Sequence, residues 1–407
     1  MSKAKPFSIS KRVVFESYKR VKANKGAAGV DQESISDFEK ELKNNLYKIW
    51  NRMSSGSYFP PPVRVVEIAK KDGGQRRLGV PTVADRIAQM VVKMYLEPCV
   101  EPYFHRDSYA YRPNRSAIQA VGIARERCWH YDWVLDLDIK GFYDNIDHDL
   151  QMRAVRKHTD CKWVLLYIER WLKAPAQLED GSLVNRDKGT PQGSVISPLL
   201  ANLFLHYGFD IWMSKNHSYI SFERYADDII VHCKSERQAR WIKWVIEKRL
   251  AECKLELHPE KTKIVYCKDD KRRGNYVNEK FDFLGYTFRP RLVKARHKDC
   301  FFVGFNPAVS NKSAKAMGNT IRSWRIHLRS GRSIEDISRS INPVVRGWIK
   351  YYGRYFSSAL SPIWYQLNNA LRKWAMRKYK KLRGRWRKAA QWLRRIVRRE
   401  PGLFAHW

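Results

Sequence analysis

The sequence predicts an α+β fold followed by an all-helical and strongly basic C-terminal region. Between about residues 130 and 290, strand-like and helix-like stretches alternate irregularly, without the regular period of a doubly wound parallel sheet. Residues 311–407 carry apolar and aromatic residues at helical spacing among 24 Lys and Arg and three acids. With 407 residues, the chain is long enough for two or three domains and a sizeable core.

The charge balance indicates a polyanionic partner. The chain holds 78 Lys and Arg against 41 Asp and Glu, which gives a formal net charge of +37. Such an excess is typical of proteins that bind nucleic acid or an anionic membrane, and it argues against an enzyme of small neutral metabolites. A hydrophobic fraction of 44%, with 15 Trp and 21 Tyr, excludes a wholly disordered basic chain.

The membrane alternative is weakened by the lack of a spanning segment. No run of about 18 apolar residues exists, and the mixed polar N-terminus lacks the apolar core of a signal peptide. We therefore expect no membrane partner and a cytoplasmic location, in the nucleoid space. The seven Cys are scattered, with no CxxC pair, so we expect reduced thiols and neither a zinc ribbon nor a disulfide framework.

Local patterns predict the elements in order. The N-terminal part has helical spacing over 12–21 and 35–50, a strand hairpin at 63–69 and 75–80, and a helix over 84–96. The middle part has a strand over 133–139, a strand hairpin over 221–234, and helices over 149–157, 164–172, 197–207 and 237–253. The Arg-dense stretch 383–399 keeps enough apolar residues for a basic helix rather than a loose tail.

Two adjacent acids, Asp227 and Asp228, stand between apolar runs. This arrangement predicts a β-hairpin with its carboxylates at the turn. Two adjacent carboxylates repel each other unless a cation neutralises them, which favours a metal site. The alternative is an ordinary solvated turn pair.

A second acidic motif, Asp136 and Asp138, lies within a predicted apolar strand. Because strand side chains alternate, these two acids share one face. A strand Asp and a turn Asp that meet on a sheet can hold two Mg²⁺ about 4 Å apart. Hard carboxylate oxygens suit Mg²⁺ and leave positions for substrate phosphates, which is the chemistry of nucleotidyl transfer.

These acids belong to runs that resemble the motifs of reverse transcriptases. The first run is Asp138–His148 (DIKGFYDNIDH), and the last is Tyr225–Asp228 (YADD). Between them stand Gly189–Ser194 (GTPQGS) and Ser197–Asn202 (SPLLAN). In order and spacing the chain specifically resembles the bacterial group II intron reverse transcriptase/maturases, over almost its whole length.

The resemblance implies a right-hand polymerase with fingers, a palm built on an antiparallel sheet, and an all-α thumb. It divides the chain into an N-terminal extension and fingers with the first palm helix (1–128), the palm (129–304), the thumb and maturase domain (305–384) and a short basic C-terminal tail (385–407). By the same resemblance, Asp138, Asp227 and Asp228 are the catalytic ligands of two Mg²⁺, and Asp136 is the weaker candidate.

The resemblance also assigns roles around the nucleotide. Phe142 resembles a steric gate against the ribose 2′-hydroxyl, with a core ring as the alternative reading. The amide of Gln192 lies in a Gly-rich turn that a nucleotide can approach closely. Lys70 and Arg76 match triphosphate contacts of the fingers hairpin, and Lys261 matches a lysine that could protonate the leaving pyrophosphate. A solvated lysine or hairpin tip is the alternative for these cations.

The C-terminal region resembles the maturase domain, most clearly over Ser340–Tyr352 (SINPVVRGWIKYY). Few residues follow it, so we expect a member of the branch without an endonuclease. The expected function is an RNA-directed DNA polymerase that binds intron RNA, assists splicing and copies the RNA into DNA. The expected partners are intron RNA and RNA template, a DNA primer or target, and deoxynucleoside triphosphates.

Two other functions remain open from the sequence. One is a related reverse transcriptase used in DNA repair or phage defence without an intron. The other is a non-catalytic RNA-binding splicing factor, against which the intact Asp138, Asp227 and Asp228 count. The sequence also leaves the oligomeric state open, a homodimer included.

Overall fold

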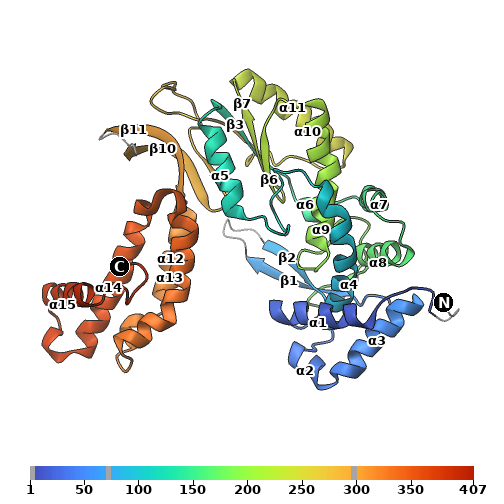
Figure 1. Ribbon diagram of the computed structural model, residues 1–407, viewed down its shortest axis with the longest axis horizontal. Coiled ribbons are helices and arrows are strands. Elements are labelled where there is room, and N and C mark those ends of the chain that lie inside the picture. The colour runs from blue at the N-terminus through green and yellow to red at the C-terminus, as the bar shows by residue number, and fades with distance from the viewer. Residues whose placement is uncertain (1–4, 70–74, 295–299) are drawn as a thin grey trace. The chain divides into compact units, whose positions relative to one another are not determined.

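A computed structural model describes residues 5–69, 75–294 and 300–407 of the chain (Figure 1). The chain forms two compact units. Unit 1 consists of Met1–Ser116, Asp136–Val231 and Arg237–Thr262, and unit 2 of Ala117–Leu135, His232–Glu236 and Lys263–Trp407. No helix within the described ranges is both long and apolar enough to cross a membrane.

Unit 1 begins with three helices, α1 (Lys11–Asn24), α2 (Ile35–Lys40) and α3 (Leu42–Ser55). The single helix expected over 35–50 is therefore wrong, because the chain breaks at Glu41 between α2 and α3. Ser34 and Asp37 form a capping box that fixes the start of α2.

The core of this part of unit 1 surrounds α4 (Val83–Val100) and α8 (Lys162–Lys173). The apolar cluster there draws on α1 and α3 as well, through buried residues that include Val14, Met53, Val91 and Tyr167. Burial on several sides fits the many apolar residues of α4, among which Asp85, Arg86 and Gln89 are buried polar residues.

The predicted hairpin is confirmed as β1 (Val63–Ala69) and β2 (Gln75–Val80), which pair antiparallel. The sequence analysis missed its extension by β4 (Ala176–Gln177), which runs parallel to β1, and by β5 (Leu183–Val184). These strands form one sheet in the order β2-β1-β4-β5.

The second sheet carries the acidic motifs. Its strands are β3 (Trp133–Asp138), β6 (Phe222–Tyr225), β7 (Asp228–Cys233) and β8 (Lys263–Tyr266), in the order β6-β7-β3-β8. The helices of this part of the chain are α5 (Ala117–Cys128), α6 (Phe142–Asn145), α7 (His148–Arg156), α9 (Ser197–Leu205), α10 (Ile211–Asn216) and α11 (Glu236–Glu252). The mixture of a sheet with irregularly placed helices confirms the predicted α+β character.

Unit 2 holds a third sheet that the sequence analysis did not predict. Strands β9 (Phe281–Phe283), β10 (Tyr286–Lys294) and β11 (Phe301–Val309) form it in the order β11-β10-β9. The expectation that residues 305–384 are all helical is thus wrong for 305–309, which belong to β11. The physical reason is pairing at a distance, because β11 is held along its length by β10, from Tyr286 opposite Val309 to Lys294 opposite Phe301.

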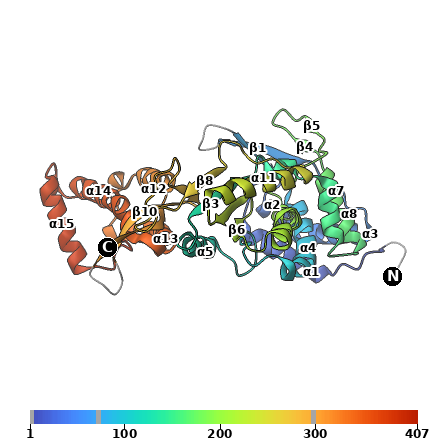
Figure 2. The same ribbon diagram turned by 90° about the horizontal axis from the view of Figure 1, so that it is seen from above.

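Four helices follow in unit 2: α12 (Asn311–Ser323), α13 (Ile334–Phe356), α14 (Ser361–Lys378) and α15 (Trp386–Arg399). Short 3₁₀ turns lie at Glu101–Tyr103, Ile326–Leu328, Ser357–Leu360 and Lys380–Leu382. The predicted basic helix over 383–399 is confirmed as α15, which packs on α14 (Figure 2).

The last residues of the chain belong to the same helical core. Phe404 is buried in it together with Trp374 and Leu393. The side chain of Asn342, inside α13, accepts from the Ala405 amide at 3.0 Å and donates to the Leu403 carbonyl at 2.9 Å. The segment after α15 therefore packs against the helical core of unit 2.

Candidate active site

The Asp227–Asp228 motif forms a tight turn, as predicted. Tyr225 and Asp228 are paired residues of β6 and β7, so Ala226 and Asp227 alone make the connection. Ala226 has a φ of 58°, in the left-handed region that two-residue hairpin turns favour. A non-glycine residue there stores backbone strain of roughly 1 to 2 kcal/mol.

Asp138 ends β3 and is joined to a distant segment by backbone hydrogen bonds. The His258 amide donates to the Asp138 carbonyl at 2.7 Å, and the Lys140 amide donates to the Glu256 carbonyl at 2.9 Å. This ladder brings Lys261 to the same place, with its Nζ 3.5 Å from Oδ2 of Asp138. The structure thus brings together two predicted residues that are far apart in the sequence.

The electrostatics join Asp228 to the same site. Burial raises the pKa of Asp228 to about 7, and the negative charges of Asp227 and Asp138 add to the rise, while Lys261 opposes it. Part of Asp228 is open to solvent, but the surrounding protein displaces enough water to disfavour its charge. Asp138, Asp227 and Lys261 therefore all act on the charge of Asp228.

The three carboxylates have the donor chemistry for Mg²⁺, since hard oxygens are its preferred ligands. The negative charges of Asp227 and Asp138 disfavour the charged form of Asp228, so a cation bound here would stabilise the ionised site. Among the described residues, no group of three His, Cys, Asp or Glu side chains is arranged so that it could hold a metal ion. A cation here would need further oxygen ligands from a substrate.

Protons and Mg²⁺ are expected to compete at Asp228. The pKa of about 7 means that the carboxyl is mostly ionised above that value and mostly protonated below it. Lowering the pH from about 8 to about 6 should therefore weaken Mg²⁺ binding about tenfold, because the ion binds the deprotonated form. Calorimetric titration with Mg²⁺ measures this. Asp228→Asn should bind more weakly and without that pH dependence, and a wild-type affinity that does not change over this range would contradict the assignment.

Phe142 begins α6, directly after Gly141, whose φ of 55° is left-handed. The Phe142 ring is 2% exposed and lies edge-on to Tyr143, with ring centroids 5.5 Å apart. Phe204 of α9 packs on it from a centroid distance of 6.3 Å. These contacts agree with the alternative that Phe142 is a ring of the core. Its role as a steric gate at a nucleotide stays a prediction.

The loop that carries Gln192 is tied to α6 and to the hairpin β1–β2. The Thr190 amide donates to the Tyr143 carbonyl at 2.8 Å, and the Gly79 amide of β2 donates to the Gln192 carbonyl at 2.8 Å. A Cβ at Gly193 would lie 2.6 Å from the Gly79 carbonyl oxygen, so this approach requires glycine. The Gln192 loop therefore links the hairpin β1–β2 to α6, the helix that follows β3. Lys70 lies outside the described residues, as does the side chain of Arg76, whose backbone pairs with Ile68.

A buried polar network supports this loop, and the sequence analysis missed it. Asp85 of α4 accepts from Tyr58 Oη at 2.8 Å, Trp171 Nε1 at 2.7 Å and Gln89 Nε2 at 2.9 Å. Oε1 of Gln89 in turn accepts from the Val195 amide at 2.8 Å. The feature of the sequence that could have revealed this network is Asp85, an acid among the apolar residues of α4.

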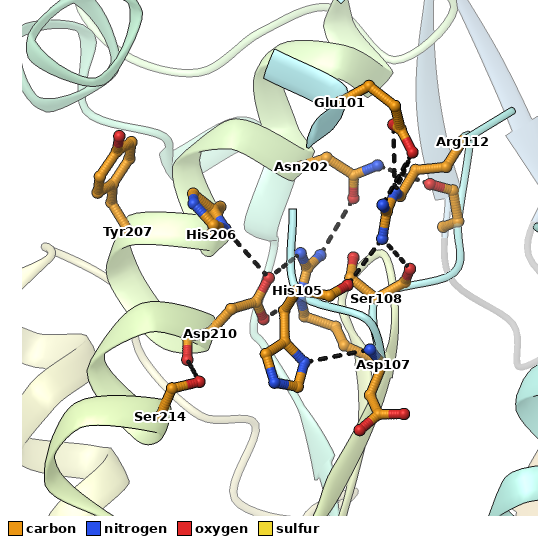
Figure 3. A network of polar contacts seen from close by, with 12 residues as sticks. Glu101, His105, Asp107, Ser108, Arg112, Asn202, His206, Tyr207, Asp210 and Ser214 are labelled. Carbon is orange, nitrogen blue, oxygen red and sulfur yellow. Dashed lines mark hydrogen bonds and ion pairs between the residues drawn. The ribbon is translucent and has the colours of Figure 1, made fainter. Parts of the chain in front are cut away.

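Arg112 has two possible roles, a structural one and contact with a template. Its Nε and Nη2 donate to Glu101, and its Nη1 donates to the carbonyls of His105 and Ser108 at 2.7 Å each (Figure 3). The side chain is 5% exposed. These contacts favour the structural role.

Two protein families match this chain. The family described as reverse transcriptase (RNA-dependent DNA polymerase) matches residues 68–288, which include Asp138, Asp227 and Asp228. The family described as the group II intron, maturase-specific domain, matches residues 314–392. The chain belongs to the group II intron reverse transcriptase/maturase family.

Relatives of this chain include bacterial and fungal proteins. Protein YkfC of Escherichia coli (strain K12) is 31% identical over 318 residues, which cover 68% of this chain and 79% of that protein. The group II intron-encoded protein LtrA of Lactococcus lactis subsp. cremoris is 36% identical over 198 residues, 48% of this chain and 32% of LtrA. The putative COX1/OXI3 intron 1 protein of Saccharomyces cerevisiae is 27% identical over 284 residues, 68% of this chain and 33% of that protein. The chain spans about a third of the length of LtrA and of the yeast protein.

Proposed function

We propose that this protein is an RNA-directed DNA polymerase that binds a group II intron RNA, assists its splicing and copies it into DNA for intron mobility. The observation that carries the proposal is the coupling of Asp138, Asp227 and Asp228 at one site inside the matched reverse transcriptase range. Carboxylates in this arrangement serve nucleotidyl transfer through bound Mg²⁺.

The proposed ligands of two Mg²⁺ are Asp138, Asp227 and Asp228, completed by phosphate oxygens of the incoming nucleotide. When bound, the ions activate the primer 3′-hydroxyl and stabilise the leaving pyrophosphate. Lys261, whose ammonium lies 3.5 Å from Asp138, would hold a proton near the leaving group. Lys70 and Arg76 would bind the triphosphate, and Phe142 and Gln192 the sugar and base.

The proposed architecture is a right hand. Fingers within 1–128 contain the hairpin β1–β2, and a palm over 129–304 contains the sheet of β3, β6, β7 and β8. A thumb over 305–384 and a basic segment over 385–407 contain α12, α13, α14 and α15. The hairpin, the Gln192 loop and the acidic turn all belong to unit 1, which supports their joint action on one nucleotide.

The helices of unit 2 support RNA binding. In α15, Ala389, Leu393 and Ile396 are buried in the core at helical spacing. The exposed residues of this helix include six cations: Arg387, Lys388, Arg394, Arg395, Arg398 and Arg399. A groove beside it is lined by further cations and by the ring of Trp392. Proteins recognise RNA with cations that bind its phosphates and with aromatic rings that stack on its bases.

Primer extension tests the proposal. The wild type should extend a DNA primer on an RNA template with deoxynucleotides and Mg²⁺. The double variant Asp227→Ala/Asp228→Ala should be slower by at least about 10³-fold, because it lacks two proposed ligands. Both proteins should bind structured intron RNA equally and promote its splicing.

Each alternative has its own outcome in this experiment. A wild type that binds RNA tightly but never extends a primer would contradict the polymerase and leave a splicing factor. A wild type that extends primers but does not distinguish intron RNA from unrelated RNA would contradict the intron role, in favour of repair or defence.

A further inference from the structure

A fully buried ion pair lies next to the acidic turn. Arg224 precedes Tyr225 in β6, and Asp210 lies at the end of a π-helix, His206–Asp210. Both side chains are 0% exposed. The Arg224 Nε and Nη2 donate to the two carboxylate oxygens of Asp210 at 2.7 and 2.6 Å. Because desolvation offsets most of the attraction in such a pair, stability alone does not explain it.

The remaining donors of Arg224 point to a role at the turn. Its Nη1 donates to Oδ1 of Asn202 and to the carbonyl of Ala226, each at 3.1 Å. The Ala226 carbonyl belongs to the peptide that leads into Asp227, and Ala226 is the residue in the left-handed conformation. The guanidinium therefore restrains the strained peptide of the turn from inside the protein.

The π-helix supplies the other half of the pair. π-turns are rare and concentrate at functional sites. Arg249 of α11 donates to two carbonyls of this turn, those of Gly208 at 3.0 Å and Tyr207 at 3.1 Å. Arg249 of α11 thus stabilises the π-helix, whose last residue is Asp210.

Arg224 balances the negative charge of Asp210, because the neighbouring His206 is neutral. His206 lies with Nδ1 4.0 Å from Oδ2 of Asp210 (Figure 3). Burial lowers the pKa of His206 to about 4, so the imidazole is neutral at physiological pH. Asn202 also donates its Nδ2 to the Ala110 carbonyl at 2.6 Å, which fixes the amide that accepts from Arg224.

We propose that Arg224, held by Asp210 and Asn202, is a positioning residue that fixes the Ala226–Asp227 peptide and thereby the carboxylates of Asp227 and Asp228. The inference rests on the proposed catalytic role of those carboxylates. Arg224 itself does not touch substrate in this scheme. Its loss should lower the rate of the chemical step and weaken Mg²⁺ use, while RNA affinity stays the same.

Arg224→Lys is the test variant. Lysine retains the positive charge beside Asp210, but its single ammonium cannot reach Asp210, Asn202 and the Ala226 carbonyl with the same geometry. We expect kcat for primer extension to fall about 100-fold and half-saturating Mg²⁺ to rise about tenfold, with KM for deoxynucleotides within about threefold. Amide hydrogen exchange, read by mass spectrometry on the peptide 222–231, should become faster without any substrate.

Arg112→Lys is the matched control. Arg112 is another buried arginine of unit 1 with a carboxylate partner and two carbonyl acceptors, and none of these contacts involves the turn. It should lower the melting temperature about as much as Arg224→Lys does, with kcat and turn exchange close to those of the wild type. If Arg224→Lys does not fold, Asn202→Ala leaves the ion pair intact and should lower kcat about tenfold.

The outcomes separate this inference from the proposed function. An active wild type whose Arg224→Lys variant keeps full kcat and slow exchange would overturn the positioning role. Equal losses of kcat in Arg224→Lys and Arg112→Lys would also overturn it, because the effect would then follow stability. An inactive wild type would instead contradict the proposed function, and faster exchange in Arg224→Lys alone would still support the restraint on the turn.

Discussion

Replacing Asp138 by asparagine is expected to lower the rate of RNA-templated primer extension by at least about 10³-fold. Asparagine keeps the size of the side chain and removes the charge, so the fold should persist. Asp138 is the acid of β3 that lies 3.5 Å from Lys261 and adds to the negative field at Asp228. Without its charge, a proposed ligand of Mg²⁺ is lost and Lys261 loses its carboxylate partner.

Asp136→Asn is the matched control, because Asp136 stands two residues earlier on the same face of β3. It should keep kcat within about threefold, since Asp138 and not Asp136 contributes to the shifted pKa of Asp228. Single-turnover extension with both variants at saturating Mg²⁺ measures the chemical step, and filter binding measures RNA affinity. Equal losses of activity in the two variants, or full activity of Asp138→Asn, would contradict the assignment of Asp138 as a ligand of Mg²⁺.

Asp85→Ala is expected to give the largest loss of stability, on the order of 3 to 5 kcal/mol, with a melting temperature lower by roughly 10 °C. The substitution leaves the donors of Tyr58, Trp171 and Gln89 without their acceptor in a dry interior. Burial raises the pKa of Asp85 to about 6 even though these three donors favour the charged form. At neutral pH the carboxylate is therefore ionised and held by the network.

Thermal melts at neutral pH measure this loss. Asp37→Ala serves as the comparison, because Asp37 is an exposed acid of the α2 capping box and its loss should lower the melting temperature much less. Since Gln89 links Asp85 to the Val195 amide, Asp85→Ala should also lower activity at temperatures where it is folded. A melting temperature within about 2 °C of the wild type would refute the network as a source of stability.

Patterns of nearby residues were sufficient for several elements. The hairpin β1–β2, the strand β3, the helices α4, α8 and α11, and the turn with Asp227 and Asp228 all have apolar spacing or turn chemistry within a few residues. The sheet of β9, β10 and β11 was missed because its strands are held by partners up to 23 positions away, as in Tyr286 opposite Val309. The break at Glu41 and the π-helix at His206–Asp210 interrupt sequence that reads as continuous helix.

The sequence by itself determined which carboxylates stand in a strand and a turn, the basic helical end, and the family motifs in order. Those features depend on residue type and short spacing, which the chain carries before it folds. Only the tertiary structure decided that Lys261 lies beside Asp138 and that Arg224 joins Asp210 to the Ala226 carbonyl. A buried charge is stable only where partners from distant segments meet it, so its role becomes visible only after those segments have packed.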